Sequence, residues 1–139
     1  MTIQVAVLCD AATDYNGKLN LLGTFDTILA PQFPVMHPQC AVALRIMFDR
    51  MEEGRHQLRL NFGDEDGKSI MKNMDIPIEV SFPGEATFLS RNFIINFQPL
   101  KLDQAGLYSV DVSVDNRTLT SIPLAVRKLD QPKPPEETA

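Results

Sequence analysis

Apolar residues recur at every second position along most of this chain, whereas the three-to-four-residue repeat of an amphipathic helix is almost absent. Such alternation is typical of strands that bury one face and expose the other. Eight segments show it, at residues 3–9, 18–30, 40–50, 55–61, 75–82, 86–97, 108–115 and 119–126. Turn signals separate these segments without room for crossover helices. We therefore predict an all-β fold, an antiparallel β-sandwich of about eight strands.

Two features predict how the middle strands pair. The short link at residues 51–54 ends in a glycine, which predicts a hairpin that makes strands 40–50 and 55–61 antiparallel neighbours. Pro77 has no N–H to donate to a neighbouring strand. The strand at 75–82 is therefore expected at the edge of a sheet.

The first two strands carry signals of their own. In the first, one face is expected to hold Ile3, Val5, Val7 and Cys9. The residues between them are also apolar, which indicates a strand covered on both sides. In the second, Gly23 predicts a bulge or a close backbone approach.

The length of 139 residues suits one domain, which we place at residues 1–128. Residues 129–139 are rich in proline and acidic side chains, and their small apolar surface predicts a flexible tail. The formal net charge is −5, so the chain lacks the basic character that nucleic acid or an anionic membrane requires. No apolar run approaches the roughly 18 residues of a membrane helix. We therefore expect neither nucleic acid nor a membrane as a partner.

The two cysteines, Cys9 and Cys40, are too few for a disulfide scaffold and fit a reducing compartment. The amino terminus lacks the basic region and cleavage site of a secretory signal, so a cytoplasmic location is expected. Both cysteines lie at apolar positions of their strands. This predicts inert core residues rather than reactive thiols.

No pattern in the sequence identifies a catalytic centre, and we expect no cofactor. His37 lies in a proline-rich loop three residues before Cys40, but two such ligands do not make a zinc site. His56 occupies an apolar position, which predicts a partly buried core histidine. A loop expected at residues 10–17 holds Asp10 and Asp14, the best oxygen-rich candidates for a metal, although turns use the same residue types for backbone hydrogen bonds.

The stretch Leu100–Val110 resembles the corner before strand F of immunoglobulin-like domains, where a Leu, an Asp, a small residue and a Tyr recur. The resemblance implies an immunoglobulin-like Greek key. It also implies structural roles for Gly106 and for Tyr108, whose hydroxyl would bond to upstream backbone. Val110 stands where antibody domains have their second cysteine, and the chain has no tryptophan, so the resemblance is to the wider class.

A second resemblance covers more of the chain. Its motifs are Cys9-Asp10-Ala11, the run from Gly17 to Asp26, Phe33-Pro34, His37-Pro38 and Gly106-Leu107-Tyr108. Together they resemble a family of small bacterial proteins known only as a domain of unknown function. The resemblance implies a bacterial, cytoplasmic setting. It implies no activity, substrate or catalytic residue.

These observations favour a non-catalytic binding or assembly module that contacts a protein partner or associates with itself. In immunoglobulin-like wiring one end of the molecule would hold the loops at residues 31–39, 83–85 and 115–117. The candidate ligand-binding residues on those loops are His37, Asn116 and Arg117.

Two alternatives remain open. The first is a small metal-dependent or histidine-using hydrolase, in which His37 or His56 acts with acids from a loop. The second is self-association through the strand that contains Pro77. Proline disfavours it, because it commonly guards an edge strand against pairing.

Overall fold

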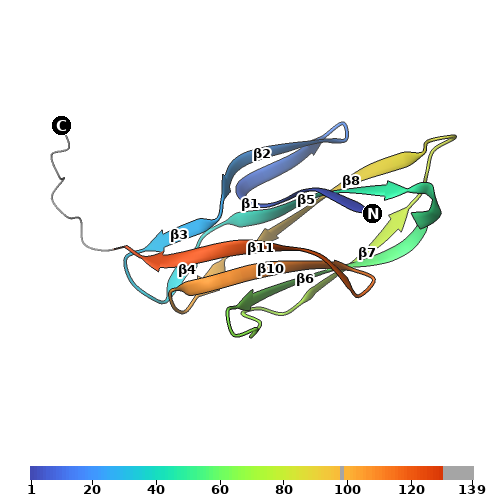
Figure 1. The fold of residues 1–139 in the computed structure, drawn as a ribbon. Helices are drawn as coiled ribbons and strands as arrows, with labels where there is room; N and C mark the ends of the chain where they lie inside the picture. Colours follow the sequence, from blue (N-terminus) through green and yellow to red (C-terminus); the bar gives the residue numbers. More distant parts are fainter. Residues whose placement is uncertain (98, 130–139) are drawn as a thin grey trace, which may run out of the picture.

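The computed structural model describes residues 1–97 and 99–129, within which eleven strands and one 3₁₀ turn form two large sheets and one small sheet (Figure 1). The first large sheet has the order β2-β1-β5-β8, formed by β1 (Thr2–Tyr15), β2 (Lys18–Phe25), β5 (Cys40–Asp49) and β8 (Phe88–Phe97). The second has the order β3-β11-β10-β6-β7, formed by β3 (Thr27–Ala30), β11 (Arg117–Lys128), β10 (Gly106–Val114), β6 (Gly54–Asp64) and β7 (Met74–Val80). The small sheet pairs β4 (Val35–His37) with β9 (Leu100–Leu102).

The prediction of an all-β fold is confirmed, with three more strands in the described residues than the eight expected. The segment 18–30 divides at Asp26 into β2 and β3, which belong to different sheets, and the short strands β4 and β9 add the other two. One pairing is not antiparallel, because β11 and β3 run parallel to each other. The immunoglobulin-like Greek key stays a prediction.

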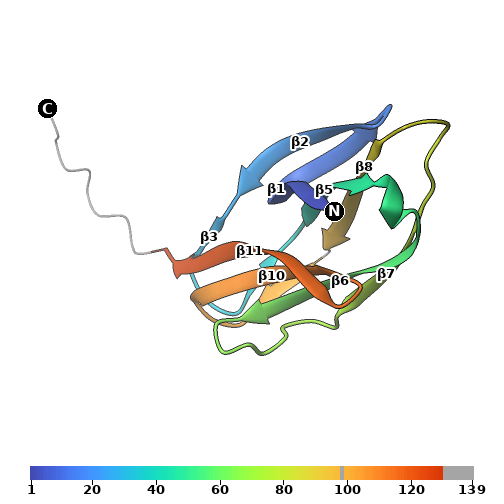
Figure 2. The ribbon, with the colours of Figure 1, turned by 45° about the vertical axis from the view of Figure 1, so that its right-hand side comes forward.

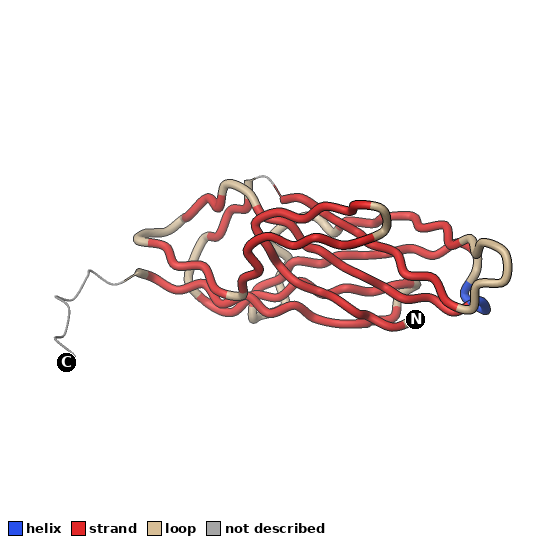
Figure 3. The backbone as a smooth tube through the Cα atoms, turned by 90° about the horizontal axis from the view of Figure 1, so that it is seen from above, coloured by secondary structure: helices blue, strands red, loops and turns tan. Residues whose placement is uncertain are grey.

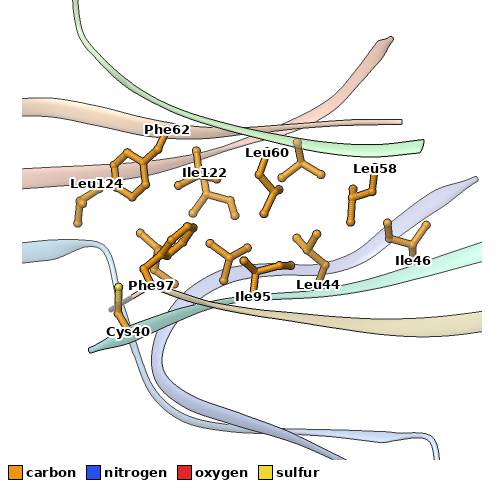
Figure 4. Packing of buried hydrophobic residues seen from close by; sticks show 14 of the residues in the cluster. Cys40, Leu44, Ile46, Leu58, Leu60, Phe62, Ile95, Phe97, Ile122 and Leu124 are labelled. Carbon is orange, nitrogen blue, oxygen red and sulfur yellow. The ribbon is translucent and has the colours of Figure 1, made fainter. Parts of the chain in front are cut away.

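Apolar side chains from both large sheets fill the space between them (Figure 4). Leu58 and Leu60 of β6 face Leu44 and Ile46 of β5 across this core. In β10 the predicted alternation holds, since every second residue from Tyr108 onward is buried and the residues between are half-buried. Burial of such side chains contributes about 1.5–3 kcal/mol each, so this layer supplies most of the stabilisation.

The expected hairpin between β5 and β6 is wrong. β5 pairs with β1 and β8, whereas β6 pairs with β7 and β10 in the other sheet. The link between them contains the 3₁₀ turn η1 (Arg50–Glu52), which carries the chain from one sheet to the other. The backbone N–H of Asp49 donates to the Glu52 carboxylate at 3.0 Å and closes this turn. Alternation shows which face of a strand is buried, but it does not show which sheet the strand joins, because strands of both sheets bury one apolar face.

β7 is the terminal strand of the second sheet, so the edge position that Pro77 predicted is confirmed. Its only strand neighbour among the described residues is β6, in which Gln57 lies opposite Pro77. A proline at this position does not remove a hydrogen bond from the interior of the sheet.

The first strand differs from its prediction. A register shift between Ile3 and Val5 changes the face of the residues that follow. As a result Ile3 and Leu8 pack in the main core, while Val7 and Cys9 lie on the opposite face. The expectation that the odd-numbered residues share one face is therefore wrong, and the expectation of a strand covered on both sides is confirmed.

The second half of β1 and the facing part of β2, residues 11–22, form a two-stranded ribbon that folds back over the outer face of the first sheet (Figure 1). We call it the folded ribbon. Its side chains Ala12 and Leu19 pack against a small buried cluster of Cys9, Ala41 and Ala43. The folded ribbon therefore supplies the second cover of β1.

Polar contacts hold the tip of the folded ribbon. The guanidinium of Arg45 donates to the Gly17 carbonyl at 2.9 Å and to the Asn92 side chain at 2.8 Å. The Asn92 amide in turn donates to the Asp14 carboxylate at 2.9 Å. These contacts attach the tip to β5 and β8.

The predicted tail at residues 129–139 lies outside the described residues from residue 130 onward, and the domain boundary stays a prediction. Leu129, the last described residue, donates its N–H to the Ala30 carbonyl at 2.7 Å, beside the paired ends of β3 and β11. Within residues 1–97 and 99–129, no helix has the length and apolar character needed to span a membrane.

Candidate functional site

Three segments meet at one end of the molecule, which we call the η1 end: residues 50–56, with η1 and the start of β6, residues 81–87 between β7 and β8, and residues 115–117, with the β10–β11 turn and the first residue of β11. Figure 3 shows the 3₁₀ turn in blue at this end. The guanidinium of Arg50 donates to the carbonyls of Gly84 at 2.7 Å and Ala86 at 2.8 Å. Specific hydrogen bonds therefore hold the β7–β8 loop against η1.

His56 of β6 connects the third segment to η1. Its ring stacks on Phe48, with 5.9 Å between ring centroids. Nδ1 lies 2.6 Å from a carboxylate oxygen of Asp115, and Nε2 lies 2.5 Å from the Glu52 carbonyl. The other carboxylate oxygen of Asp115 accepts from the Gln57 N–H at 2.9 Å. The histidine thus bridges η1 and the β10–β11 turn.

Both partners of the His56 ring are hydrogen-bond acceptors, so both ring nitrogens must carry a proton to satisfy them. The arrangement favours the imidazolium form. The side-chain hydrogen bond to Asp115 raises the pKa of His56, and the hydrogen bond to the Glu52 carbonyl adds to this effect. The same contact with His56 lowers the pKa of Asp115, and the Gln57 N–H acts in the same direction.

A cavity of about 310 Å³ adjoins this pair. Its walls include Met51, His56, Val114, Asp115, Arg117 and Leu119. Met51 is 95% exposed at the rim. Within the described residues, no hydrogen bond or ion pair engages the Arg117 guanidinium. The cavity therefore combines apolar side chains and the Glu52 and Asp115 carboxylates, which are already paired with the Met1 amino group and with His56, with the Arg117 guanidinium, which can bind an anionic group.

The structure brings two of the three predicted ligand-binding residues to the η1 end. Asn116 lies in the β10–β11 turn with a φ of +66°, and Arg117 begins β11 beside it. His37 lies at the opposite end, in β4, with its ring 5.7 Å from that of Phe25. The pairs of β4 with β9 continue the register of β5 with β8, and the ten residues of β5 span about 30 Å. His37 therefore does not share a surface with Asn116 and Arg117.

The loop expected at residues 10–17 is wrong, because β1 extends to Tyr15 and only the tip of the folded ribbon turns. The Asp14 carboxylate accepts from the Gly17 N–H at 3.0 Å and from Asn92, so it serves the ribbon tip. Asp10 lies directly against Gly23 between the paired strands β1 and β2, just before the folded ribbon. Among residues 1–97 and 99–129, no group of three or more His, Cys, Asp or Glu side chains is placed to hold a metal ion.

Both cysteines are fully buried and unbonded to each other. Burial raises the pKa of the Cys40 thiol to about 11 and also raises that of Cys9. A thiol that stays protonated is a poor nucleophile. This geometry supports inert core roles for both residues.

The residues given structural roles behave as follows. The Tyr108 hydroxyl donates to the Gln104 carbonyl at 2.6 Å, so the upstream hydrogen bond is present. Gly23 has a φ of +66°, and an added Cβ would meet the Asp10 carboxylate, so the close approach is to a side chain. Gly106 has a φ of +156°, with the Glu65 carboxylate 3.0 Å from where a Cβ would lie.

The pairing of His56 with Asp115 was missed from the sequence, because 59 positions separate the two residues. Two signals could have suggested it. His56 occupies an apolar position near the start of a strand, where a buried imidazole needs a partner. Asp115 lies in a tight turn, where a carboxylate commonly bonds to backbone.

A comparison with curated proteins found no match. A family model described as a family of unknown function, DUF6941, matches residues 4–127 and so covers the whole of both large sheets except their terminal residues. The uncharacterised family expected from the sequence motifs is therefore shown, and the chain belongs to DUF6941.

Proposed function

We propose that this protein is a non-catalytic binding module whose protein partner contacts the η1 end. The observation that carries the proposal is that hydrogen bonds fix the three segments of the η1 end to one another. Around them lie Met51 and Arg117, exposed side chains without a partner among the described residues. Arg50 and His56 make these attachments, and neither depends on a ligand. A surface that is already ordered loses less conformational entropy when a partner binds.

The chemistry of the η1 end suits a protein partner. Met51 projects at its rim, and Phe88, which is 62% exposed, follows the β7–β8 loop. Aromatic residues, methionine and arginine are enriched in protein interfaces. Arg117 lines the same cavity as Met51 and adds a cation to it. The expected partner surface therefore presents an apolar side chain close to a carboxylate.

The geometry of the histidines does not favour a hydrolase. A general base needs a free ring nitrogen within reach of the nucleophile. Both ring nitrogens of His56 already donate to acceptors, the Asp115 carboxylate and the Glu52 carbonyl, so neither is free to take a proton from a nucleophile. Neither histidine hydrogen bonds to a serine, threonine or cysteine side chain in the described part of the chain.

The proposal also includes the wiring of the sheets, the compartment and the source of the protein. The hydrogen bond of Tyr108 supports an immunoglobulin-like wiring of the sheets. The free thiols of Cys9 and Cys40 support a reducing, cytoplasmic compartment, and the motif resemblance supports a bacterial source.

Photo-crosslinking tests the proposal. A benzophenone amino acid placed at Met51 is compared with the same group at Met36, which is 52% exposed and lies in β4 at the opposite end. We expect a defined adduct with another protein from position 51 only, and a lower yield when Arg117→Ala is added. Equal adducts from both positions, or only adducts of the chain with itself, would contradict the proposal.

A further inference from the structure

The two large sheets have four terminal strands, and three of them carry features that hinder pairing with another chain. β3 has only four residues. β7 contains Pro77 between the acidic residues Asp75 and Glu79. β2 is interrupted at Gly23, where φ is +66°. Short length, proline, charge and backbone irregularity are the means by which natural proteins protect sheet edges.

The fourth terminal strand, β8 (Figure 2), is longer and more regular than these three, and its one feature of this kind is the charged side chain of Arg91, which donates to the Glu79 carbonyl of β7 at 2.9 Å. It has ten residues without proline or glycine, and Arg91 is its only charged side chain. It pairs with β5 without a register shift, and no other strand pairs with it within the described residues. A long and regular edge of this kind presents a row of free N–H and C=O groups.

The side chains of β8 are also incompletely covered. Residues 89–94 are all half-buried. Their core-facing partners on β5, such as Leu44 and Phe48, are fully buried. Leu89 and Phe93 face the main core, because they pair with Phe48 and Leu44. Another strand along this edge would bury the apolar area that they still expose.

We propose that β8 is a self-association surface, on which β8 of a second copy pairs antiparallel about a two-fold axis at Asn92. In antiparallel pairs directly opposite side chains lie on the same face of the sheet. On the core side this register places Leu89 opposite Ile95 of the second copy. It also places Arg91 opposite Phe93 of the second copy.

A second copy fits this edge because the strand is complementary to itself in that register. Apolar residues meet apolar residues on the core side, and the single charge meets an aromatic ring instead of an equal charge. Arg91 already lies 5.7 Å from the centroid of Phe93 in its own chain, so this contact type is accessible to it. The two four-stranded sheets would join into one continuous sheet of eight strands.

The outer face supplies the positions for a test. In the proposed register Ser90 lies opposite Ile94 of the second copy, twice by symmetry. The double variant Ser90→Lys/Ile94→Lys therefore places like charges directly opposite at two points. Repulsion at two such pairs corresponds to about a tenfold weaker association. The variant Thr118→Lys/Thr120→Lys adds the same charge to β11 and serves as the control.

Sedimentation equilibrium of the full chain over a range of concentrations measures the effect. The wild type and the Thr118/Thr120 control are expected to shift from 15.5 kDa toward twice this mass with concentration. The lysine variant at Ser90 and Ile94 is expected to need about tenfold more protein for the same shift. Mixing it with Ser90→Glu/Ile94→Glu should restore association, which shows that both variants fold.

Three results would overturn the proposal. The first is a wild type that stays at 15.5 kDa at every concentration. The second is a lysine variant that associates as the wild type does, because association would then use another surface. The third is a mixture of lysine and glutamate variants that remains unassociated. None of these results bears on Met51 or Arg117 at the η1 end, so this inference and the proposed function can fail separately.

Discussion

Replacing His56 with phenylalanine tests the charged bridge between η1 and the β10–β11 turn. The phenyl ring would retain the stacking on Phe48, but both hydrogen bonds of the imidazole would be lost. Hydrogen bonds that involve a charged group contribute about 1.5–3 kcal/mol, and partly exposed ion pairs contribute about 1 kcal/mol or less. The Asp115 side chain is 45% exposed, so its contact belongs to the second class, while the bond to the Glu52 carbonyl is partly buried. We expect a total loss of about 2 kcal/mol in the free energy of unfolding at pH 6, or about 8 °C in Tm.

The pH dependence identifies the cause of this loss. The folded protein raises the pKa of His56 above 6.5, so the stabilisation is fully present below pH 6.5 and is lost as the pH rises through the folded-state value. Asp115 has a lowered pKa, so its contribution is present above pH 3.8 and is lost as the pH falls through its folded-state value. The difference between wild type and variant should therefore be largest between about pH 4 and 6.5 and clearly smaller at pH 9.

Urea unfolding followed by far-ultraviolet circular dichroism at pH 6 and pH 9 measures both differences. Asp115→Asn is the matched control, because it removes the charge and keeps a hydrogen-bond acceptor for His56. This control should lose most of the pH dependence that the wild type shows between pH 6 and 9. A stability difference between wild type and His56→Phe that is equal at pH 6 and pH 9 would refute the assignment of an imidazolium.

Three further predictions concern the fold. Tyr108→Phe removes the hydroxyl that donates to Gln104 and should lower the free energy of unfolding by about 1 kcal/mol, measured by urea titration. Gly23→Ala should destabilise by more than Gly17→Ala, because both glycines have a positive φ but only the Cβ at Gly23 meets another side chain, and equal losses in thermal unfolding would contradict this. The Cys40 thiol, whose pKa burial raises to about 11, should react with a thiol reagent at pH 7 only after denaturant is added, and rapid reaction of the folded protein would show that its environment is open.

Local sequence patterns predicted a substantial part of the fold. The alternation in β10 identified its buried face, because side chains in a strand point to opposite sides in turn. Pro77 identified the edge strand β7. The motif around Tyr108 predicted a hydrogen bond to upstream backbone, which is present because the donor and acceptor lie only four residues apart.

The same patterns failed where a strand had to choose a neighbour. β5 and β6 both bury one apolar face, and this property does not reveal that they belong to different sheets. The bulge after Ile3 and the folded ribbon also escaped prediction, since each depends on contacts with β5.

The candidate site shows the same division. Asn116 and Arg117 were predicted to lie on the loop at residues 115–117. The turn is present at Asp115 and Asn116, and Arg117 begins β11. His37 was grouped with them, but β5 separates it from them by the length of the sheet.

The sequence by itself determined most of the segments that become strands, the buried face of regular strands such as β10, and the edge position of β7. These properties are carried by residues within a few positions of one another. Only the tertiary structure decided how the strands divide between the sheets, where the folded ribbon lies and which contacts raise the pKa of His56. Each of these depends on side chains that are distant in sequence, such as His56 and Asp115, and their mutual attraction exists only once packing has brought them within hydrogen-bonding distance.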